Sequence, residues 1–213
     1  LIKKDGTIII EVQYLLNTLK DLTFDNIYHE HYNYWSLTSL VAFFKRFKAT
    51  IYKAEKINTH GGSLRIYVKK NLKTKTEKSV KSLLIEEENF GIKKYRTYQD
   101  FAKKVYKIRD NVRKNISKLK ENSTKIIGYG SPAKATTALN FFGISEEIDC
   151  IVEDNKLKQG KLLPGVKIPI VSKSDIKDKP DYALVLAWNF INEIKSKNID
   201  LAHKFISIKD LEN

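Results

Sequence analysis

Two histidines, a tyrosine and two carboxylates lie together in residues 24–31, FDNIYHEH. In an extended segment, His29 and His31 would point to one face, as a metal pair could, but no third ligand with recognisable spacing is nearby. A general base suits the residue types better, because histidine titrates near neutral pH and Tyr28 or Glu30 could orient it or hold a substrate hydroxyl. The residues alone leave the choice between this base and an ordinary polar loop open.

A second candidate for chemistry is the run GYGSPAK at residues 128–134. It stands between an expected strand and an expected helix, where backbone N–H groups and the helix dipole can hold a phosphate. Lys134 could add a point charge. As a dinucleotide fingerprint the run is weak, since Ala133 stands where the third glycine would be. The residues favour a ligand-binding loop over a merely tight turn.

Further polar residues follow neighbouring strands of the same expected sheet. In an open parallel sheet, ligands bind beyond the carboxyl ends of the strands. Three stretches would sit at that edge, namely residues 129–131, 153–155 and 188–189, and three lysines follow the second strand closely at Lys156, Lys158 and Lys161. This placement favours an anionic ligand.

The elements that must position these residues alternate between strand and helix from residue 125 onward. Such alternation predicts a parallel sheet with helices on both faces. The expected strands are 125–130, 148–152, 182–187 and 205–208, and the expected helices are 133–142, a short one after Ser172, and 191–197. This part is a small complete α/β domain.

The N-terminal part has a different pattern. Four β-branched residues from Thr7 to Ile10 predict a buried strand, and residues 13–35 look irregular and aromatic. Ser36 is the expected N-cap of a helix through about residue 48. Strands at 50–57 and 63–69 follow, and alternation in the second suggests an antiparallel edge pair.

The middle of the chain is helical and basic. A helix is expected over 77–90 with its end at Gly91, and apolar residues from Phe101 to Leu119 form one stripe of a second helix. Residues 69–120 hold 17 Lys and Arg against six Asp and Glu, so most of the net charge of +14 lies here. We favour a solvated lysine-rich face over a polyanion-binding surface, and do not expect a nucleic-acid partner.

Two further features bound the protein class. Cys150 is the only cysteine, which excludes an internal disulfide and a cysteine-based zinc cluster within this chain. No run approaches the roughly 18 apolar residues that a membrane span needs, so a cytoplasmic protein is expected. The opening at Leu1 suggests a chain truncated at its N-terminus.

Five motifs in order resemble the sugar C-methyltransferase family: FDNIYHEHYNYWSL, NTHGGSLRIYV, GYGSPAKATTALNFFGI, VEDNKLKQGKLLPGVKIPI and ALVLAWNF. The resemblance covers nearly the whole chain. It implies an α/β fold with three parts: the tail of a class I methyltransferase sheet at 1–70, a helical connector at 71–122, and a Rossmann-like parallel-sheet domain at 123–213.

The resemblance also implies a mechanism. A base removes the proton alpha to a ketone on a nucleotide-linked keto-sugar, and the enolate carbon attacks the methyl group of S-adenosylmethionine. The second histidine of the matching motif is the expected base, which is His31 here, with Tyr28 and Glu30 as sugar contacts. The remaining expected substrate-binding residues are Tyr129, Ser131 and Lys134 near the phosphates, and Asn155, Lys158 and Asn189.

The family's donor loop and zinc-binding cysteines would precede Leu1. We therefore expect S-adenosylmethionine to be bound mainly by upstream residues, zinc to belong to that region only, and this chain to be a fragment that is inactive alone. The expected partner is a small nucleotide-sugar substrate, and the oligomeric state stays open. The alternative is a non-catalytic module that binds a nucleotide-sugar or another anion without methyl transfer.

Overall fold

The computed structural model describes residue 3 and residues 5–58, 62–121 and 123–212, apart from the side chain of Asn189. The chain forms two compact units. Unit 1 comprises residues 1–24 and 30–104, and unit 2 comprises residues 25–29 and 105–213. Their division falls within one long helix, α4 (Tyr95–Lys120). The three-part division expected from the resemblance stays a prediction.

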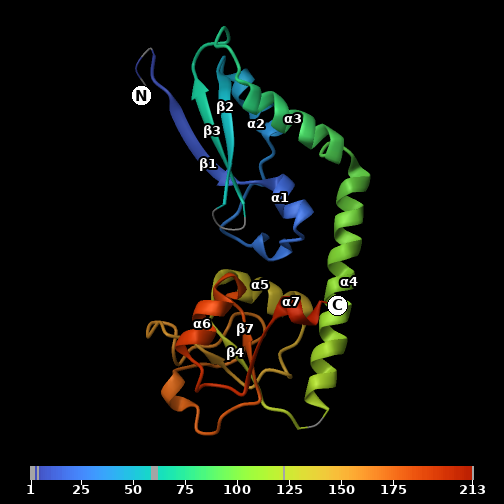
Figure 1. The fold of residues 1–213 in the computed structure, drawn as a ribbon, viewed down its shortest axis with the longest axis vertical. Helices are drawn as coiled ribbons and strands as arrows, with labels where there is room; N and C mark the ends of the chain where they lie inside the picture. The colour runs from blue at the N-terminus through green and yellow to red at the C-terminus, as the bar shows by residue number, and fades with distance from the viewer. Residues whose placement is uncertain (1–2, 4, 59–61, 122, 213) are drawn as a thin grey trace. The chain divides into compact units, whose positions relative to one another are not determined.

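Unit 1 is built on a three-stranded antiparallel sheet with the order β1-β3-β2. The strands and helices of unit 1, in chain order, are β1 (Ile8–Gln13), α1 (Leu15–Lys20), α2 (Leu37–Arg46), β2 (Thr50–Ile57), β3 (Ser63–Lys69) and α3 (Lys78–Phe90). Figure 1 shows α2 and α3 beside the strands. The predicted helix after Ser36, the two strands and the helix ending at Gly91 are confirmed.

The alternating pattern of β3 explains the core of unit 1. Leu64, Ile66 and Val68 are all fully buried, because alternate side chains of a strand point to the same face. Together with residues of α1, α2 and α3 they form one apolar cluster. Ser36 caps α2 as predicted, since its hydroxyl accepts a hydrogen bond from the Ser39 N–H at 3.0 Å.

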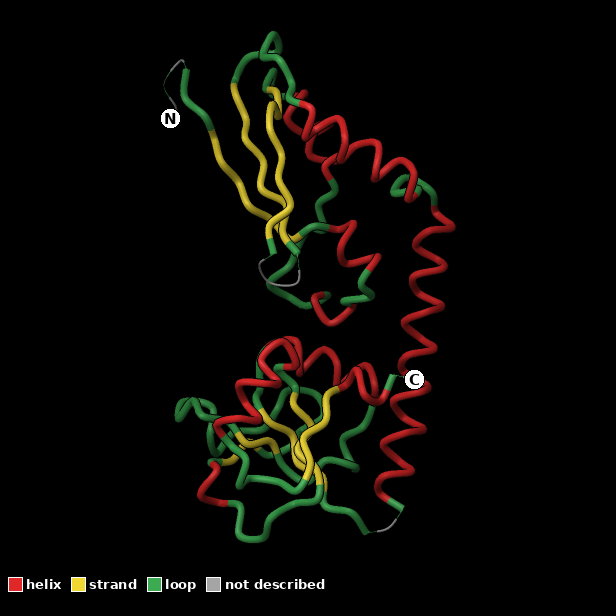
Figure 2. Tube along the Cα trace, in the orientation of Figure 1, coloured by secondary structure: helices red, strands yellow, loops and turns green. Residues whose placement is uncertain are grey.

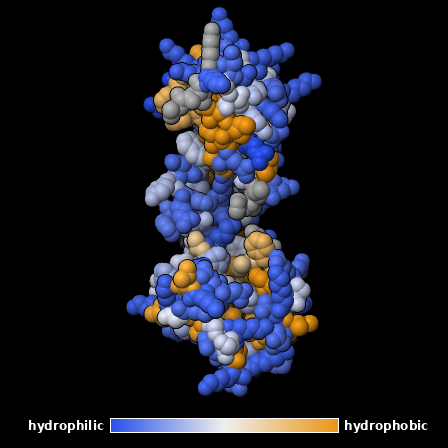
Figure 3. All heavy atoms as spheres, turned by 90° about the vertical axis from the view of Figure 1, so that its left-hand side faces the viewer, coloured by the Kyte–Doolittle hydropathy of each residue, from blue (hydrophilic) through white to orange (hydrophobic). Residues whose placement is uncertain are grey.

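Two expectations for unit 1 were wrong, and a third was right in part. The segment 13–35 contains a helix, α1, which buries Leu16 and Leu19. The predicted antiparallel pairing of β2 with β3 is confirmed and β2 is an edge strand, but β3 is central because it lies between β1 and β2. The strand β1 is half exposed, with Ile9 at 59% exposure, because alternate side chains point to opposite faces and only the face of Ile8 and Ile10 packs against the core. Figure 3, seen from the side where β1 lies in Figure 1, shows apolar atoms gathered on unit 1 among hydrophilic ones.

Unit 2 holds a five-stranded, entirely parallel sheet with the order β6-β5-β4-β7-β8. Its elements are β4 (Ile126–Tyr129), α5 (Ala133–Phe142), β5 (Ile151–Val152), β6 (Ile170–Val171), β7 (Tyr182–Val185), α6 (Ile191–Lys197), β8 (Lys204–Ser207) and α7 (Ile208–Leu211). Short 3-10 helices lie at Lys173–Asp175 and Trp188–Phe190. Figure 2 shows these strands among helices and long loops.

The parallel sheet and its crossovers confirm the expected α/β class. The central strand β4 is buried along its length, as a strand covered on both faces must be. Sequence reasoning missed β6 and α7 because each is very short. None of the helices in the described ranges is long and apolar enough to cross a membrane.

Candidate functional site

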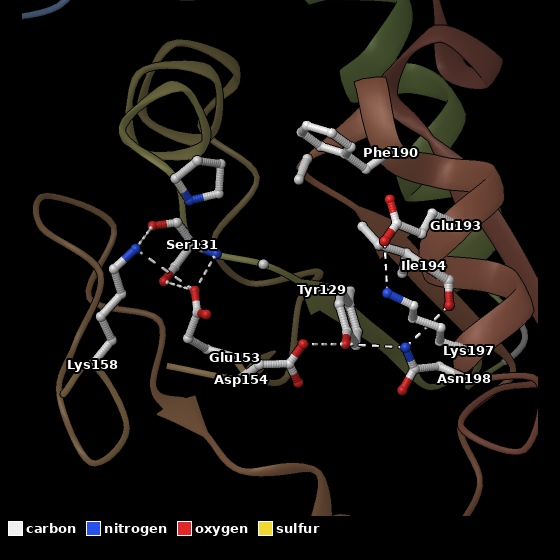
Figure 4. A pocket seen from close by; sticks show the side chains of 13 residues that line it. Tyr129, Ser131, Glu153, Asp154, Lys158, Phe190, Glu193, Ile194, Lys197 and Asn198 are labelled. Carbon is white, nitrogen blue, oxygen red and sulfur yellow. Dashed lines mark hydrogen bonds and ion pairs between the residues drawn. The ribbon is translucent and has the colours of Figure 1, made fainter. Parts of the chain in front are cut away.

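A pocket of about 590 Å³ lies in unit 2, where β4, β5 and β7 end. Figure 4 shows Ser131, Glu153 and Lys158 on one side of it and Phe190, Glu193, Lys197 and Asn198 on the other, with Tyr129 and Asp154 between them. This is the carboxyl edge of a parallel sheet, the edge at which such sheets bind ligands. The described part of the chain thus brings together residues that are up to 69 positions apart.

Two glycines allow the chain to make the turn at this edge. Gly128 sits within β4, where an added Cβ would come within 2.9 Å of Ile151 and 3.1 Å of Leu186, so only glycine permits the close packing. Gly130 has a φ of +83°, a left-handed conformation that favours glycine. The turn then enters α5 at Pro132.

The first side of the pocket is organised by the Glu153 carboxylate. It accepts hydrogen bonds from the Ser131 N–H at 2.9 Å, the Ser131 hydroxyl at 2.6 Å and the Asn155 N–H at 3.0 Å. The Lys158 ammonium lies 3.7 Å from Glu153 and donates to the Ser131 carbonyl at 2.8 Å. Burial acts to raise the pKa of Glu153, but these hydrogen bonds and the Lys158 charge outweigh it and hold the pKa below its usual value.

These contacts change how the turn can bind an anion. The Gly130 N–H donates to the Val152 carbonyl, and the Ser131 N–H is taken by Glu153. Two of the backbone donors that a phosphate could use are therefore engaged within the protein. The Lys158 ammonium has three protons and retains capacity for a ligand.

Between the two sides of the pocket, a chain of hydrogen bonds runs through Tyr129. Its hydroxyl donates to Asp154 at 2.9 Å and accepts from the Asn198 amide at 3.1 Å. Burial, together with the hydrogen bond to Asp154 and its charge, raises the pKa of Tyr129 to about 12, so this hydroxyl stays protonated. Asp154 is exposed and can accept further hydrogen bonds from a ligand.

The helix α6 supplies the far wall. Glu193 and Lys197 form an ion pair at 2.6 Å, one helical turn apart. Phe190, just before α6, is 59% exposed and offers an aromatic face at the pocket edge. Sequence reasoning missed Phe190, Glu193, Lys197 and Asn198, although the position of α6 directly after a strand that ends at this edge is the signal that could have found them.

Five of the six predicted substrate-binding residues divide into two groups. Tyr129, Ser131 and Lys158 line the pocket. Lys134 instead lies 3.7 Å from Asp25 and over the Trp188 ring, and the Asn155 side chain caps its own loop by accepting from the Leu157 N–H. The side chain of Asn189 lies outside the described part of the chain.

The predicted catalytic residues lie in the segment between α1 and α2. Tyr28 and His31 are half-buried, and Glu30 is exposed. The His31 ring contacts the Tyr34 ring edge-on, with 6.4 Å between centroids. Among the described residues, no cluster of three or more His, Cys, Asp or Glu side chains could hold a metal ion.

The fold is that of a Rossmann-like domain with a pocket at the carboxyl edge of its sheet. The family model of the C-methyltransferase C-terminal domain matches residues 58–207. The C-methyltransferase NovU of Streptomyces niveus is 35% identical over 197 residues, which cover 91% of this chain and 47% of that protein. The chain belongs to the C-methyltransferase family, and it spans about half the length of this curated relative.

Proposed function

We propose that the chain serves an S-adenosylmethionine-dependent C-methyltransferase that methylates the carbon alpha to a ketone on a nucleotide-linked keto-sugar. The observation that supports this substrate class is that the pocket is lined by both acidic and basic side chains. Its walls hold three carboxylates, Glu153, Asp154 and Glu193, against two lysines, Lys158 and Lys197. A site with this balance suits a ligand that carries hydroxyls as well as phosphates better than it suits a bare anion.

The pocket offers a partner for each part of such a ligand. Ligand hydroxyls donate to the exposed Asp154 carboxylate, and phosphate oxygens accept from Lys158 and Lys197. Phe190 gives a face on which a nucleobase stacks. These contacts support binding of the nucleotide part of the substrate by unit 2.

In the proposed reaction His31 is the base. Its imidazole takes the proton from the carbon next to the ketone, and the electron pair of that C–H bond forms the carbon–carbon double bond of an enolate. The enolate carbon then forms a bond to the donor methyl group, and the breaking carbon–sulfur bond leaves its electron pair on sulfur. A base of this kind contributes about 10²–10⁴ in rate. Tyr28 and Glu30 are proposed to hold the sugar hydroxyls.

We propose that the methyl donor is bound mainly by residues outside these 213. In unit 1 only Tyr14 separates β1 from α1, so the described residues there hold no glycine-rich loop between a strand and a helix. The donor supplies the electrophilic methyl group, and we propose that any zinc of the whole protein is bound outside these 213 residues.

The test is exchange of the sugar's alpha proton with solvent. The full-length protein is incubated in D₂O with a nucleoside-diphosphate-linked keto-sugar, and deuterium incorporation is followed by NMR. His31→Ala should lower incorporation by at least about 10²-fold, whereas the neighbouring His29→Ala should leave it near the unmodified rate. Unchanged incorporation in His31→Ala would remove His31 as the base. Nucleotide binding without any incorporation by the unmodified protein would favour the non-catalytic module.

A further inference from the structure

A fully buried carboxylate lies on α3, at Glu87. Acidic side chains are almost never fully buried without partners. One carboxylate oxygen of Glu87 accepts from the Tyr14 hydroxyl at 2.8 Å and from the Leu37 N–H at 2.6 Å. The other oxygen accepts from the Thr38 N–H at 2.8 Å. All four residues belong to unit 1.

The three donors stand at the two ends of one segment. Tyr14 directly precedes α1, and Leu37 and Thr38 are the first two residues of α2. Between them lie residues 15–36, which include His31. The ends of this segment also meet through the backbone, since the Leu15 N–H donates to the Trp35 carbonyl at 2.9 Å. A single side chain from a third element, Glu87 of α3, therefore holds the two ends of the segment together.

A negative charge at this place has a physical reason. The first N–H groups of a helix have no partner within the helix, and the positive end of its dipole stabilises an anion there. A glutamine would present one NH₂ group to these donors and could not satisfy them all. Burial, followed by the charge of Glu87 and the hydrogen bond to it, raises the pKa of Tyr14, so its hydroxyl stays a donor.

We propose that Glu87 is a positioning residue for His31. By accepting hydrogen bonds at both ends of the segment 15–36, its carboxylate fixes the backbone conformation that positions the His31 imidazole. Glu87 touches neither substrate nor the reacting atoms. The catalytic consequence rests on the function proposed above, whereas the structural consequence does not.

Amide hydrogen exchange tests the structural consequence. Glu87→Gln should make the amides of residues 24–35 exchange at least about tenfold faster, while those of β3 keep their rates. Tyr14→Phe, a smaller change that removes one donor only, should act on the same amides to a lesser degree. The matched control is Glu86→Gln, because Glu86 is the neighbouring residue and forms ion pairs with Lys20 and Lys56 at the surface.

The control should leave exchange in residues 24–35 unchanged. If β3 exchanges faster in Glu87→Gln because that variant does not fold, Tyr14→Phe decides the matter. Unchanged exchange of residues 24–35 in a folded Glu87→Gln or in Tyr14→Phe would overturn the proposal.

Kinetics of the full-length protein test the catalytic consequence. Glu87→Gln should lower the rate of alpha-proton exchange by about tenfold at saturating keto-sugar, with little change in KM, because ligand contacts stay and only the base is misplaced. An unchanged rate in Glu87→Gln, together with an inactive His31→Ala, would overturn the positioning role. An active His31→Ala would instead remove the proposed function, and the amide exchange would still decide whether Glu87 holds the segment.

Discussion

The two regions that carry the candidate chemistry use their carboxylates in opposite ways. In unit 1, Glu87 is fully buried, and its carboxylate accepts hydrogen bonds from neutral donors at the two ends of one segment. In unit 2, the Glu153 side chain keeps 13% exposure beside Lys158, and Asp154 is exposed. The buried carboxylate can only hold structure, whereas those at the pocket remain available to a ligand.

Each unit contains one tryptophan, whose fluorescence can report the unfolding of that unit. The chain has two tryptophans, and Trp35 belongs to unit 1 whereas Trp188 belongs to unit 2. Variants in which one of them is replaced by phenylalanine allow the unfolding of the two units to be followed separately by fluorescence. The comparison between a structural and a ligand-facing carboxylate can therefore be tested in one protein.

The largest effect is expected from Glu87→Ala. Loss of this carboxylate leaves buried donors without a partner and opens a cavity, so the unfolding free energy reported by Trp35 should fall by about 3–5 kcal/mol. Urea denaturation of the variant that retains only Trp35 measures it. Glu86→Ala should cost less than about 1 kcal/mol, because exposed ion pairs are weak. Equal losses in the two variants would contradict a special role for the buried group.

A smaller effect is expected at the pocket from Lys158→Ala. Removing the ammonium should weaken binding of a nucleoside diphosphate by about tenfold, or about 1.4 kcal/mol, because one charge-assisted hydrogen bond is lost. Isothermal titration calorimetry measures the dissociation constant. Lys156→Ala is the matched control, since Lys156 is in the same loop, is exposed and does not line the pocket. Equal weakening by both variants would point to the general positive charge of the loop instead.

The smallest effect is a dependence of stability on pH. The pKa of Glu153 is lower in the folded protein than in the unfolded chain, so its ionised form contributes stability above the unfolded value of about 4.3. That contribution is lost as pH falls through the lower, folded pKa. The stability reported by Trp188 should therefore decline less steeply below about pH 4.3 in Glu153→Gln than in the unmodified protein. Glu146→Gln, at an exposed position of unit 2, should keep the steeper profile.

Local signals explain which elements could be predicted from the sequence. Ser36, Gly91 and Gly143 mark helix ends, and the alternation of Leu64, Ile66 and Val68 marks a half-buried strand. These features act over a few residues and leave a readable pattern. The helix α1 lacked such a mark, since Tyr14 at its N-cap position makes no side-chain capping bond.

The candidate pocket was predicted only in part for a related reason. The turn at residues 129–131 and the acidic pair Glu153 and Asp154 follow strands directly, so the rule for parallel sheets places them at one edge. Asn198 donates a hydrogen bond to Tyr129, which is 69 positions away in the sequence, and no local sequence pattern predicts that contact. The expected positions of Lys134 and Asn155 also depended on side-chain directions, which spacing along the chain does not fix.

The sequence by itself determined the class of fold, the family and the segment that carries His31, because strand and helix periodicity and ordered motifs are properties of the linear chain. Only the tertiary structure decided that the Ser131 N–H donates a hydrogen bond to Glu153 and that Glu87 holds both ends of the segment 15–36. Both contacts join residues more than 20 positions apart. They arise because packing brings a carboxylate to backbone donors that would otherwise be buried without a partner.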